Sequence, residues 1–268
     1  FASVMQVPRW FLVQSEVDKT RLAGIGSPAD RIRVAGSVKY DDAGADEPGL
    51  RRIESVLSRC DLGGSDRVIL LGGSTWPGEE AILLDITRKL RAAYPNLRLV
   101  LVPRHMERRR EVEEIIRERG FSCVLRSQLQ AGSTRQLGVE DVLLVDSTGE
   151  LKYFYGCASL VFVGKSLAEH GGQNIIEPAV MGKPIMVGPN MENFPEIIGD
   201  FRSAGAIVQV ADAAGLEEAI RDLVRDPVRR TGLGEKAAAL VAARRGALAK
   251  SVDLIIPFVR HDTPPGQR

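Results

Sequence analysis

Short apolar segments alternate with longer amphipathic segments along most of the chain, and this alternation restricts the possible folds more than any other feature. Apolar runs such as residues 97–102 and 160–163 consist almost entirely of Val, Leu and Phe. Strands of this kind are typical of parallel sheets whose two faces are covered by helices. The pattern therefore predicts an α/β fold with a doubly wound parallel sheet.

The expected elements follow one another in regular alternation. The expected strands are residues 10–13, 31–35, 68–71, 97–102, 122–125, 142–145, 160–163, 184–187 and 206–210. The expected helices are residues 78–93, 107–119, 174–181, 215–225 and 234–257.

The charge balance and the cysteines argue against several classes of function. The 36 Lys and Arg residues balance 35 Asp and Glu residues in a chain of 268, so no net field favours nucleic acid or an acidic membrane surface. Cys60, Cys123 and Cys157 are far apart and form no C-x-x-C pair, which argues against a disulfide framework or a zinc site. The apolar runs are shorter than the roughly 18 residues of a membrane-spanning helix. We expect no nucleic acid partner, no metal and no cofactor.

Residues 41–49, which read D-D-A-G-A-D-E-P-G, separate two parts of the chain. Acidic and turn-forming residues without hydrophobic periodicity are typical of a linker. Residues 1–43 are too few to bury a core of their own, so we expect them to be the C-terminal tail of an incomplete N-terminal domain and the start of the linker. Residues 44–268 are expected to form one Rossmann-like domain. The chain begins at Phe1 and not at Met, in the middle of the alternation of strand and helix signals. We therefore expect further residues to precede it.

Polar residues follow several of the expected strands. Ligands of open parallel sheets bind beyond the carboxyl ends of the strands, so these residues are candidates for a site. The stretch G-G-S-T-W-P-G-E-E at residues 72–80 directly follows an expected strand. Its glycines allow a ligand to approach the backbone closely, and Ser74 or Thr75 can either cap the next helix or donate a hydroxyl to a ligand.

A second candidate is P-R-H at residues 103–105, after the strand 97–102. Arg104 carries a planar fork of donors that matches phosphate or carboxylate, and His105 can donate a hydrogen bond or move a proton. The alternative is an exposed Arg followed by a His that begins a helix. The position at the end of a strand favours the ligand-binding interpretation.

A third candidate is D-S-T-G-E-L at residues 146–151. Here a structural interpretation leads, in which Asp146 or Ser147 caps a helix and Glu150 lies in its first turn. In the alternative, Ser147 and Thr148 line a cleft.

The fourth candidate begins G-K-S-L-A-E-H-G-G-Q-N at residue 164. If Asn174 caps the following helix, Glu177 occupies its third position and forms a capping-box-like pair. That interpretation leaves Gly171 and Gly172 unexplained, because their backbone N–H groups are expected to be available to a phosphate. If the helix begins earlier, the carboxylate of Glu177 points into the cleft, where it can accept hydrogen bonds from a ribose diol.

The loop G-P-N-M-E-N-F follows the next expected strand at residues 188–194. Its Asn190 or Asn193 can contact the polar edges of a ligand. The glycine-rich loop, the N-x-x-E-P helix, the strand and this loop together are more specific than any one of them.

The run F-V-G-K-S-L-A-E-H-G-G-Q-N-I-I-E-P-A-V-M-G-K-P-I-M-V-G-P-N-M-E-N-F-P-E-I resembles the donor-site signature of the 3-deoxy-D-manno-oct-2-ulosonic acid (Kdo) transferases of lipopolysaccharide synthesis. Further matching segments, at residues 11–16, 36–41, 72–80, 102–105 and 146–155, extend the resemblance over almost the whole chain. It implies the GT-B architecture, in which two Rossmann-like domains face each other across a cleft. This chain then corresponds to the C-terminal, sugar-nucleotide-binding domain and the last segment of the N-terminal domain.

The resemblance also implies roles for individual residues. Arg104 binds the phosphate of CMP-Kdo, and Asn174 with the N–H groups of Gly171 and Gly172 holds the same phosphate or the ribose. Glu177 binds the ribose hydroxyls. The remaining members of the expected donor-binding set are Ser74, Thr75, His105, Ser147, Lys165, Ser166, Gln173 and Asn193.

Two positions differ from the pattern of that family. Gly164-Lys165-Ser166 stands where Gly-Gly-Ser is usual, and Gln173 stands where His is usual. We expect Lys165 to pair with the phosphate or the sugar carboxylate of the donor. Gln173 can still donate a hydrogen bond but carries no charge.

The implied activity is that of an inverting glycosyltransferase that moves Kdo from CMP-Kdo to a lipid A precursor at the cytoplasmic face of the bacterial inner membrane. No catalytic residue is assigned in this chain, because the glutamate that acts as general base in the family has no counterpart here. Peripheral membrane association is also expected to depend on the missing N-terminal part of the protein. Two alternatives stay open. One is another GT-B enzyme that uses a nucleoside-diphosphate sugar, and the other is a non-catalytic nucleotide-binding module of the same fold.

Overall fold

The computed structural model describes residues 3–41, 44–60, 62–64, 66–129, 137–138 and 141–259. The chain divides into two compact units, one made of Phe1–Ala43 with Val241–Arg268 and the other of Gly44–Leu240. The larger unit thus ends at Leu240, not at the chain end expected from the sequence. The smaller unit joins the two ends of the chain partly through the carboxylate of Asp41, which accepts hydrogen bonds from the N–H groups of Gly246 and Leu248 at 2.6 and 2.7 Å.

The smaller unit contains a short parallel pair of strands, β1 (Phe11–Val13) and β2 (Ile32–Val34). Helix α1 (Glu16–Gly24) connects them, and its first turn is capped by the hydroxyl of Ser15, which accepts a hydrogen bond from the N–H of Asp18 at 3.1 Å. The last helix, α10 (Ala247–Val259), belongs to the same unit. Single 3-10 turns occur at Val4–Gln6, Ala29–Arg31 and Val38–Tyr40.

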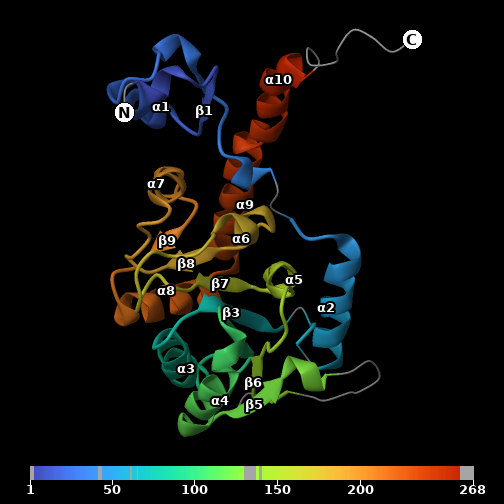
Figure 1. Cartoon of the computed structure of the whole chain (residues 1–268). Coiled ribbons are helices and arrows are strands. Elements are labelled where there is room, and N and C mark those ends of the chain that lie inside the picture. The colour runs from blue at the N-terminus through green and yellow to red at the C-terminus, as the bar shows by residue number, and fades with distance from the viewer. Residues whose placement is uncertain are drawn as a thin grey trace, which may run out of the picture. The chain divides into compact units, whose positions relative to one another are not determined.

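The larger unit is built on a parallel sheet. Within the described residues its seven strands lie in the order β5-β6-β4-β3-β7-β8-β9, and every neighbouring pair is parallel (Figure 1). The expectation of a doubly wound, Rossmann-like sheet is confirmed. The strands are β3 (Val68–Thr75), β4 (Leu97–Pro103), β5 (Ser122–Leu125), β6 (Asp141–Leu144), β7 (Leu160–Val163), β8 (Ile185–Val187) and β9 (Val208–Gln209).

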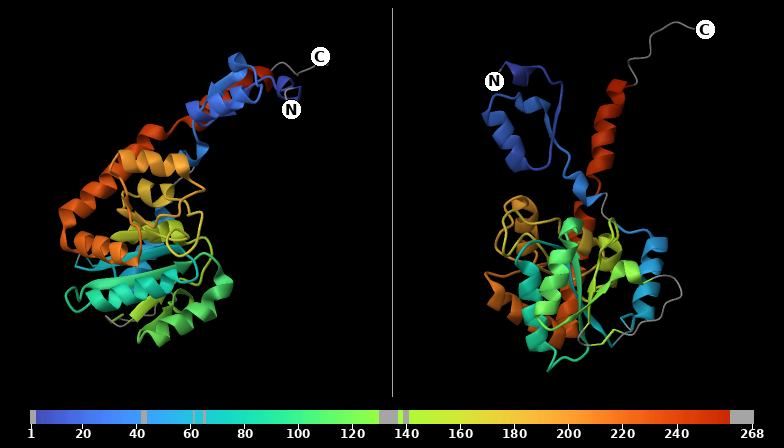
Figure 2. Two further views of the ribbon diagram at one scale, coloured as in Figure 1. Left: turned by 90° about the vertical axis from the view of Figure 1, so that its left-hand side faces the viewer. Right: turned by 60° about the horizontal axis from the view of Figure 1, so that its bottom comes forward.

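Helices cover both faces of this sheet (Figures 1 and 2). On one face α3 (Glu79–Leu90) packs against β3 and β4 and contacts α4 (Arg109–Glu118) and α8 (Ala213–Arg225). On the other face α5 (Leu151–Cys157) packs against β3 and contacts α2 (Glu47–Arg59). The unit also contains α6 (Ile176–Val180), α7 (Pro195–Ser203) and most of α9 (Pro227–Arg244), and the 3-10 turns Met106–Arg108 and Arg126–Gln128.

The core lies between the sheet and the helices α3, α4 and α8. Leu70, Leu101 and Phe162 from the strands are fully buried and belong to the same apolar cluster as Leu83 and Ile220 from the helices. Burying such side chains is the main source of stability, at about 1.5–3 kcal/mol for each. This core fixes the strands, and the strands fix the loops at their carboxyl ends.

The structure differs from the sequence-based expectation at several helices. The expected helix 234–257 is two helices, because the chain turns at Gly246, whose φ of +101° is the left-handed conformation that glycine tolerates. Part of the expected linker belongs to α2, which begins at Glu47 with the carboxylate of Asp46 as its cap. Helix α7 was also not expected.

Candidate functional site

Four loops meet at the carboxyl edge of the sheet, following the neighbouring strands β4, β3, β7 and β8. Their backbones are hydrogen-bonded to one another: Arg104 N–H donates to Thr75 O at 3.0 Å, and Asn190 N–H donates to Ser166 O at 2.9 Å. Asn193 N–H donates to Gly171 O at 3.1 Å. The loops that carry most of the expected donor-binding residues therefore form one connected surface.

A fully buried carboxylate, that of Glu79 at the start of α3, lies beneath the loops after β3 and β7. Its Oε2 accepts hydrogen bonds from the N–H groups of Trp76 and Lys165 at 2.9 Å each, and its Oε1 accepts from those of Ser166 and Leu167 at 3.0 Å each. Burial raises the pKa of the Glu79 carboxyl, against the opposing effect of the four N–H groups. Sequence reasoning missed this residue, although its place one residue after the glycine turn of residues 72–78 was a usable signal.

Two residues beside Glu79 adopt backbone conformations that side chains rarely take. Ser74 has a φ of 52° and Lys165 a φ of 56°, both in the left-handed region. The loops approach so closely at Gly164 that an added Cβ would lie 2.4 Å from Ser74 O and 2.7 Å from Glu79 Oε2. Strained residues of this kind cluster at ligand-binding and active sites.

Basic and aromatic side chains surround these loops. The Lys165 ammonium lies 4.5 Å from the centre of the Trp76 ring, and the His105 ring meets the same indole edge-on at a centroid distance of 5.1 Å. Arg104 is exposed, and its guanidinium has no hydrogen-bond or ion-pair partner within the described part of the chain. A guanidinium with its donors open at a strand end is suited to bind a phosphate or a carboxylate.

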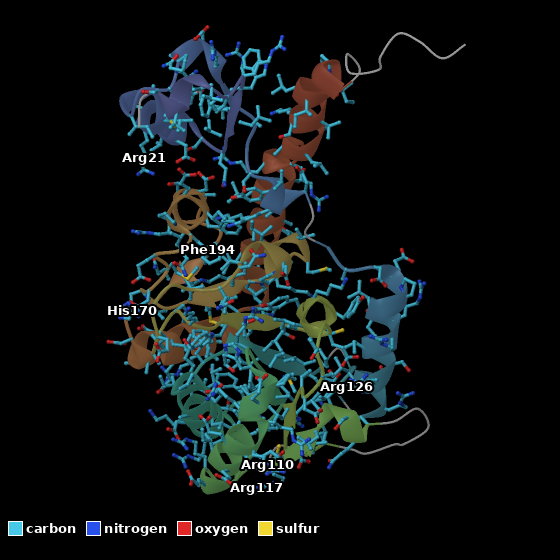
Figure 3. The ribbon with its side chains drawn as sticks, in the orientation of Figure 1. Arg21, Arg110, Arg117, Arg126, His170 and Phe194 are labelled. Carbon is cyan, nitrogen blue, oxygen red and sulfur yellow. The ribbon has the colours of Figure 1, made fainter. Side chains whose placement is uncertain are left out.

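The N–H groups of Gly171 and Gly172 are occupied, which differs from the expectation that they are available to a phosphate. Gly171 N–H donates to the carboxylate of Glu192 at 2.8 Å, and Gly172 N–H donates to Lys165 O at 2.7 Å. Glu192 also contacts Nδ1 of His170, which is labelled in Figure 3. The loop after β8 thus supplies the acceptor for Gly171, and the backbone of the loop after β7 itself supplies the acceptor for Gly172.

Helix α6 begins at Ile176, so Glu177 is its second residue and not the third position of a capping box. Asn174 Oδ1 accepts from the Ile176 N–H at 3.0 Å, and its Nδ2 donates to Glu177 Oε1 at 3.4 Å. Burial raises the pKa of the half-buried Glu177 carboxyl. Tyr155 lies close behind it, and burial together with the charge of Glu177 raises the pKa of this phenol.

The hydroxyl groups of the expected set have different surroundings. Ser166 is fully buried, and its Oγ donates to Val163 O at 2.6 Å and accepts from Gly188 N–H at 2.9 Å, so it joins two loops. Thr75 is also fully buried, and its Oγ1 has no hydrogen-bond partner in the described structure. Ser147 donates to the carboxylate of Glu150.

Of the other expected residues, Asn193 is exposed beside Gly171, and Gln173 is half-buried. In the third loop, helix α5 begins at Leu151, after the expected first-turn residue Glu150. Asp146 caps no helix there: its carboxylate accepts hydrogen bonds from the N–H and the hydroxyl of Ser127 at 2.8 and 2.6 Å. The side chains of Asp146 and Ser147 thus make local contacts.

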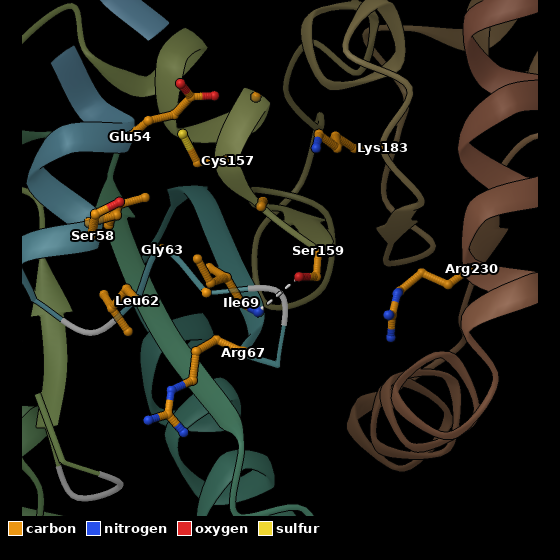
Figure 4. A pocket seen from close by; sticks show the side chains of 14 residues that line it. Glu54, Ser58, Leu62, Gly63, Arg67, Ile69, Cys157, Ser159, Lys183 and Arg230 are labelled. Carbon is orange, nitrogen blue, oxygen red and sulfur yellow. Dashed lines mark hydrogen bonds between the residues drawn. The ribbon is translucent and has the colours of Figure 1, made fainter. Parts of the chain in front are cut away.

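A pocket of about 530 Å³ lies at the opposite edge of the sheet (Figure 4). Ile69, Ser159 and Lys183, which help to line it, lie at the amino-terminal ends of β3, β7 and β8, and none of the expected donor-binding residues contributes to it. Arg230, in the first turn of α9, donates to Leu223 O near the C-terminus of α8 at 3.0 Å. A cation complements the carbonyl groups at a helix C-terminus, which gives Arg230 a structural role.

Comparison with known proteins gives several matches to glycosyltransferases. The model of the group 1 glycosyl transferases matches residues 133–240. A 3-deoxy-D-manno-octulosonic acid transferase of Haemophilus influenzae is 36% identical over 252 residues, which are 93% of this chain and 57% of that relative. The transferase of the same name from Bordetella pertussis is 34% identical over 91% of this chain and 55% of its own length. The chain thus spans little more than half the length of these relatives.

Solved structures agree with this fold. The C-terminal CMP-Kdo binding domain of WaaA from Acinetobacter baumannii is similar with a TM-score of 0.66 and 28% identity, over 73% of this chain and 99% of that domain. HepE of Anabaena, solved with UDP, has a TM-score of 0.55 at 13% identity over 94% of this chain and 64% of its own, and shows the fold alone. The motifs, the sheet and these matches together place the chain in the family of the 3-deoxy-D-manno-octulosonic acid (Kdo) transferases, with the Rossmann-like fold of GT-B glycosyltransferases.

Proposed function

We propose that this chain is the donor-binding part of an enzyme that transfers Kdo from CMP-Kdo to a lipid A precursor in lipopolysaccharide synthesis. The observation that carries the proposal is the similarity to the CMP-Kdo binding domain of WaaA, 99% of which this chain covers. The carboxyl edge of the sheet supports it, because the open guanidinium of Arg104 and the carboxylate of Glu177 both lie on loops or helices that begin there.

The proposed donor contacts follow from the chemistry of the groups. Arg104 binds the phosphate through two donors, and Glu177 accepts hydrogen bonds from the ribose hydroxyls. Lys165 supplies a second positive charge for the phosphate or the sugar carboxylate, once its ammonium leaves the ring of Trp76. Because two N–H groups expected to hold the phosphate are occupied, side chains carry more of the phosphate binding than the sequence suggested.

The remaining expected residues keep supporting roles in this proposal. Ser74, Thr75, His105 and Asn193 border the donor site, whereas Ser166 and Asn174 hold the loops in place through the contacts described above. Gln173 and Ser147 stay candidates for contact with the donor.

In the proposed reaction an acceptor hydroxyl attacks the anomeric carbon and CMP leaves with inversion. The bond between the anomeric carbon and the phosphate oxygen breaks, so negative charge grows on a single phosphate. A fixed guanidinium stabilises that charge best, and removing one such donor costs about 2.7–4 kcal/mol in the transition state. The general base is proposed to come from the part of the relatives' length that this chain does not span.

The proposed place of action is the cytoplasmic face of the inner membrane, where the lipid acceptor is made. Within the described residues, no helix has both the length and the apolar character to cross a bilayer. We propose peripheral association through residues outside this chain.

Two measurements test the proposal. The isolated chain is titrated with CMP and with UDP by calorimetry, and tighter binding of CMP is expected; preference for UDP would favour another GT-B enzyme. The full-length gene product is then assayed for transfer of Kdo to a lipid A precursor. If it binds CMP but transfers no Kdo, the chain is a nucleotide-binding module and the enzymatic proposal is wrong.

A further inference from the structure

Glu79 joins two loops that follow different strands. Its carboxylate accepts four backbone hydrogen bonds, one from the loop after β3, through Trp76, and three from the loop after β7, through residues 165–167. Consecutive backbone N–H groups that point at one centre are the arrangement in which loops bind phosphate. Here a carboxylate of the chain itself fills that position, and the positive end of helix α3 stabilises its charge.

The two loops are held in conformations that they would not keep unaided. The left-handed backbone at Ser74 and at Lys165 is strained and persists only where the surroundings enforce it. The N–H of Lys165 is bound by Glu79 directly, and Ser74 O lies against Gly164, which precedes Lys165. The contacts of Glu79 therefore hold the Lys165 turn directly, and the Ser74 turn indirectly, through the Trp76 N–H and the close approach at Gly164.

We propose that Glu79 is a positioning residue of the nucleotide site: its carboxylate fixes the backbone at Ser74 and Lys165 and thereby aims the side chains that meet the donor. The proposal rests on the proposed function for the identity of the nucleotide. It also explains why side chains, and not the backbone, are proposed to bind the phosphate, because the N–H groups of residues 165–167 already donate to the carboxylate of Glu79.

The test uses Glu79→Gln in the full chain, with Leu84→Ala as the matched control. Gln keeps the size of Glu but has one acceptor oxygen, so two of the four N–H groups lose their acceptor. Leu84 is fully buried in the same helix and touches neither loop through a hydrogen bond, so its truncation lowers stability without altering the contacts of Glu79. Amide hydrogen exchange of residues 76 and 165–167 and the Kd for CMP are measured for both variants below their melting temperatures.

In Glu79→Gln we expect faster exchange of these amides and a Kd for CMP raised at least about tenfold, the effect of releasing one strained residue. Leu84→Ala should keep the Kd for CMP, and its amides 76 and 165–167 should exchange faster only by the factor that its lower global stability gives to all core amides. Unchanged exchange in Glu79→Gln overturns the proposal, and so does faster exchange with unchanged CMP affinity. If the unmodified chain binds no CMP, the proposed function fails, and amide exchange alone decides the role of Glu79. If Glu79→Gln does not fold, slow exchange of these amides in the unmodified chain supports the proposal and fast exchange overturns it.

Discussion

Replacing Arg104 by Ala should weaken binding of CMP without weakening the fold. The guanidinium is exposed and has no partner within the described residues, so its removal breaks no internal contact. Surface substitutions of this kind usually change the free energy of unfolding by less than about 0.5 kcal/mol. The whole effect is therefore expected in ligand binding.

The size of the loss in CMP affinity follows from the hydrogen bond between the guanidinium and the phosphate, which Arg104→Ala removes. A hydrogen bond to a charged group contributes about 1.5–3 kcal/mol, which corresponds to a Kd raised about 10- to 150-fold. Arg104→Lys keeps the charge but lacks the planar fork, so its Kd should lie between those of the other two proteins.

Calorimetry with CMP and with cytidine checks the assignment, because cytidine lacks the phosphate. Arg104→Ala should lose affinity for CMP and keep its affinity for cytidine. An equal loss for both ligands would show that Arg104 acts elsewhere, and no loss for CMP would refute the reasoning.

Two further predictions concern other parts of the structure. CMP affinity should fall as the pH drops through the pKa of Glu177, which burial raises above the ordinary 4.5, because only the ionised carboxylate accepts from both ribose hydroxyls. In Glu177→Gln this pH step should vanish from a calorimetric pH series, and its persistence would contradict the ribose contact. Gly234→Ala places a Cβ 1.9 Å from Gly182 O, a backbone atom, so it should lower stability by about 1–3 kcal/mol. Gly232→Ala in the same helix meets nothing within 4 Å, and equal melting temperatures of the two variants would disprove the clash.

The sheet was predictable from the sequence because its long strands are nearly unbroken apolar runs, apart from Arg98 in β4 and the polar end of β3. The expected strands 97–102 and 160–163 correspond to β4 and β7 almost residue for residue. Helix α2 was missed, since the turn-forming residues at its start weakened the helical pattern, and α5 was expected only from its capping residues, without bounds. The break between α9 and α10 depends on the left-handed conformation of Gly246, which cannot be predicted from hydrophobic periodicity.

The location of the site could be predicted from the sequence, but the hydrogen bonds within it could not. The carboxyl-end rule directed attention to Arg104 and Glu177 without knowledge of the sheet order. The roles of Glu79 and Glu192 depend on contacts over 86 and 21 residues of sequence, which no local pattern reports. A buried acid that binds loop amides reads in sequence like any acidic residue at a helix start.

The discontinuous smaller unit has a consequence for folding during synthesis. Asp41 and its partner Gly246 are 205 residues apart. At about 5–20 residues per second a ribosome needs roughly 10–40 s to cover that distance. Residues 44–240 can collapse around their sheet in that interval, whereas Asp41 has to stay without its partners Gly246 and Leu248 until these residues have been synthesised.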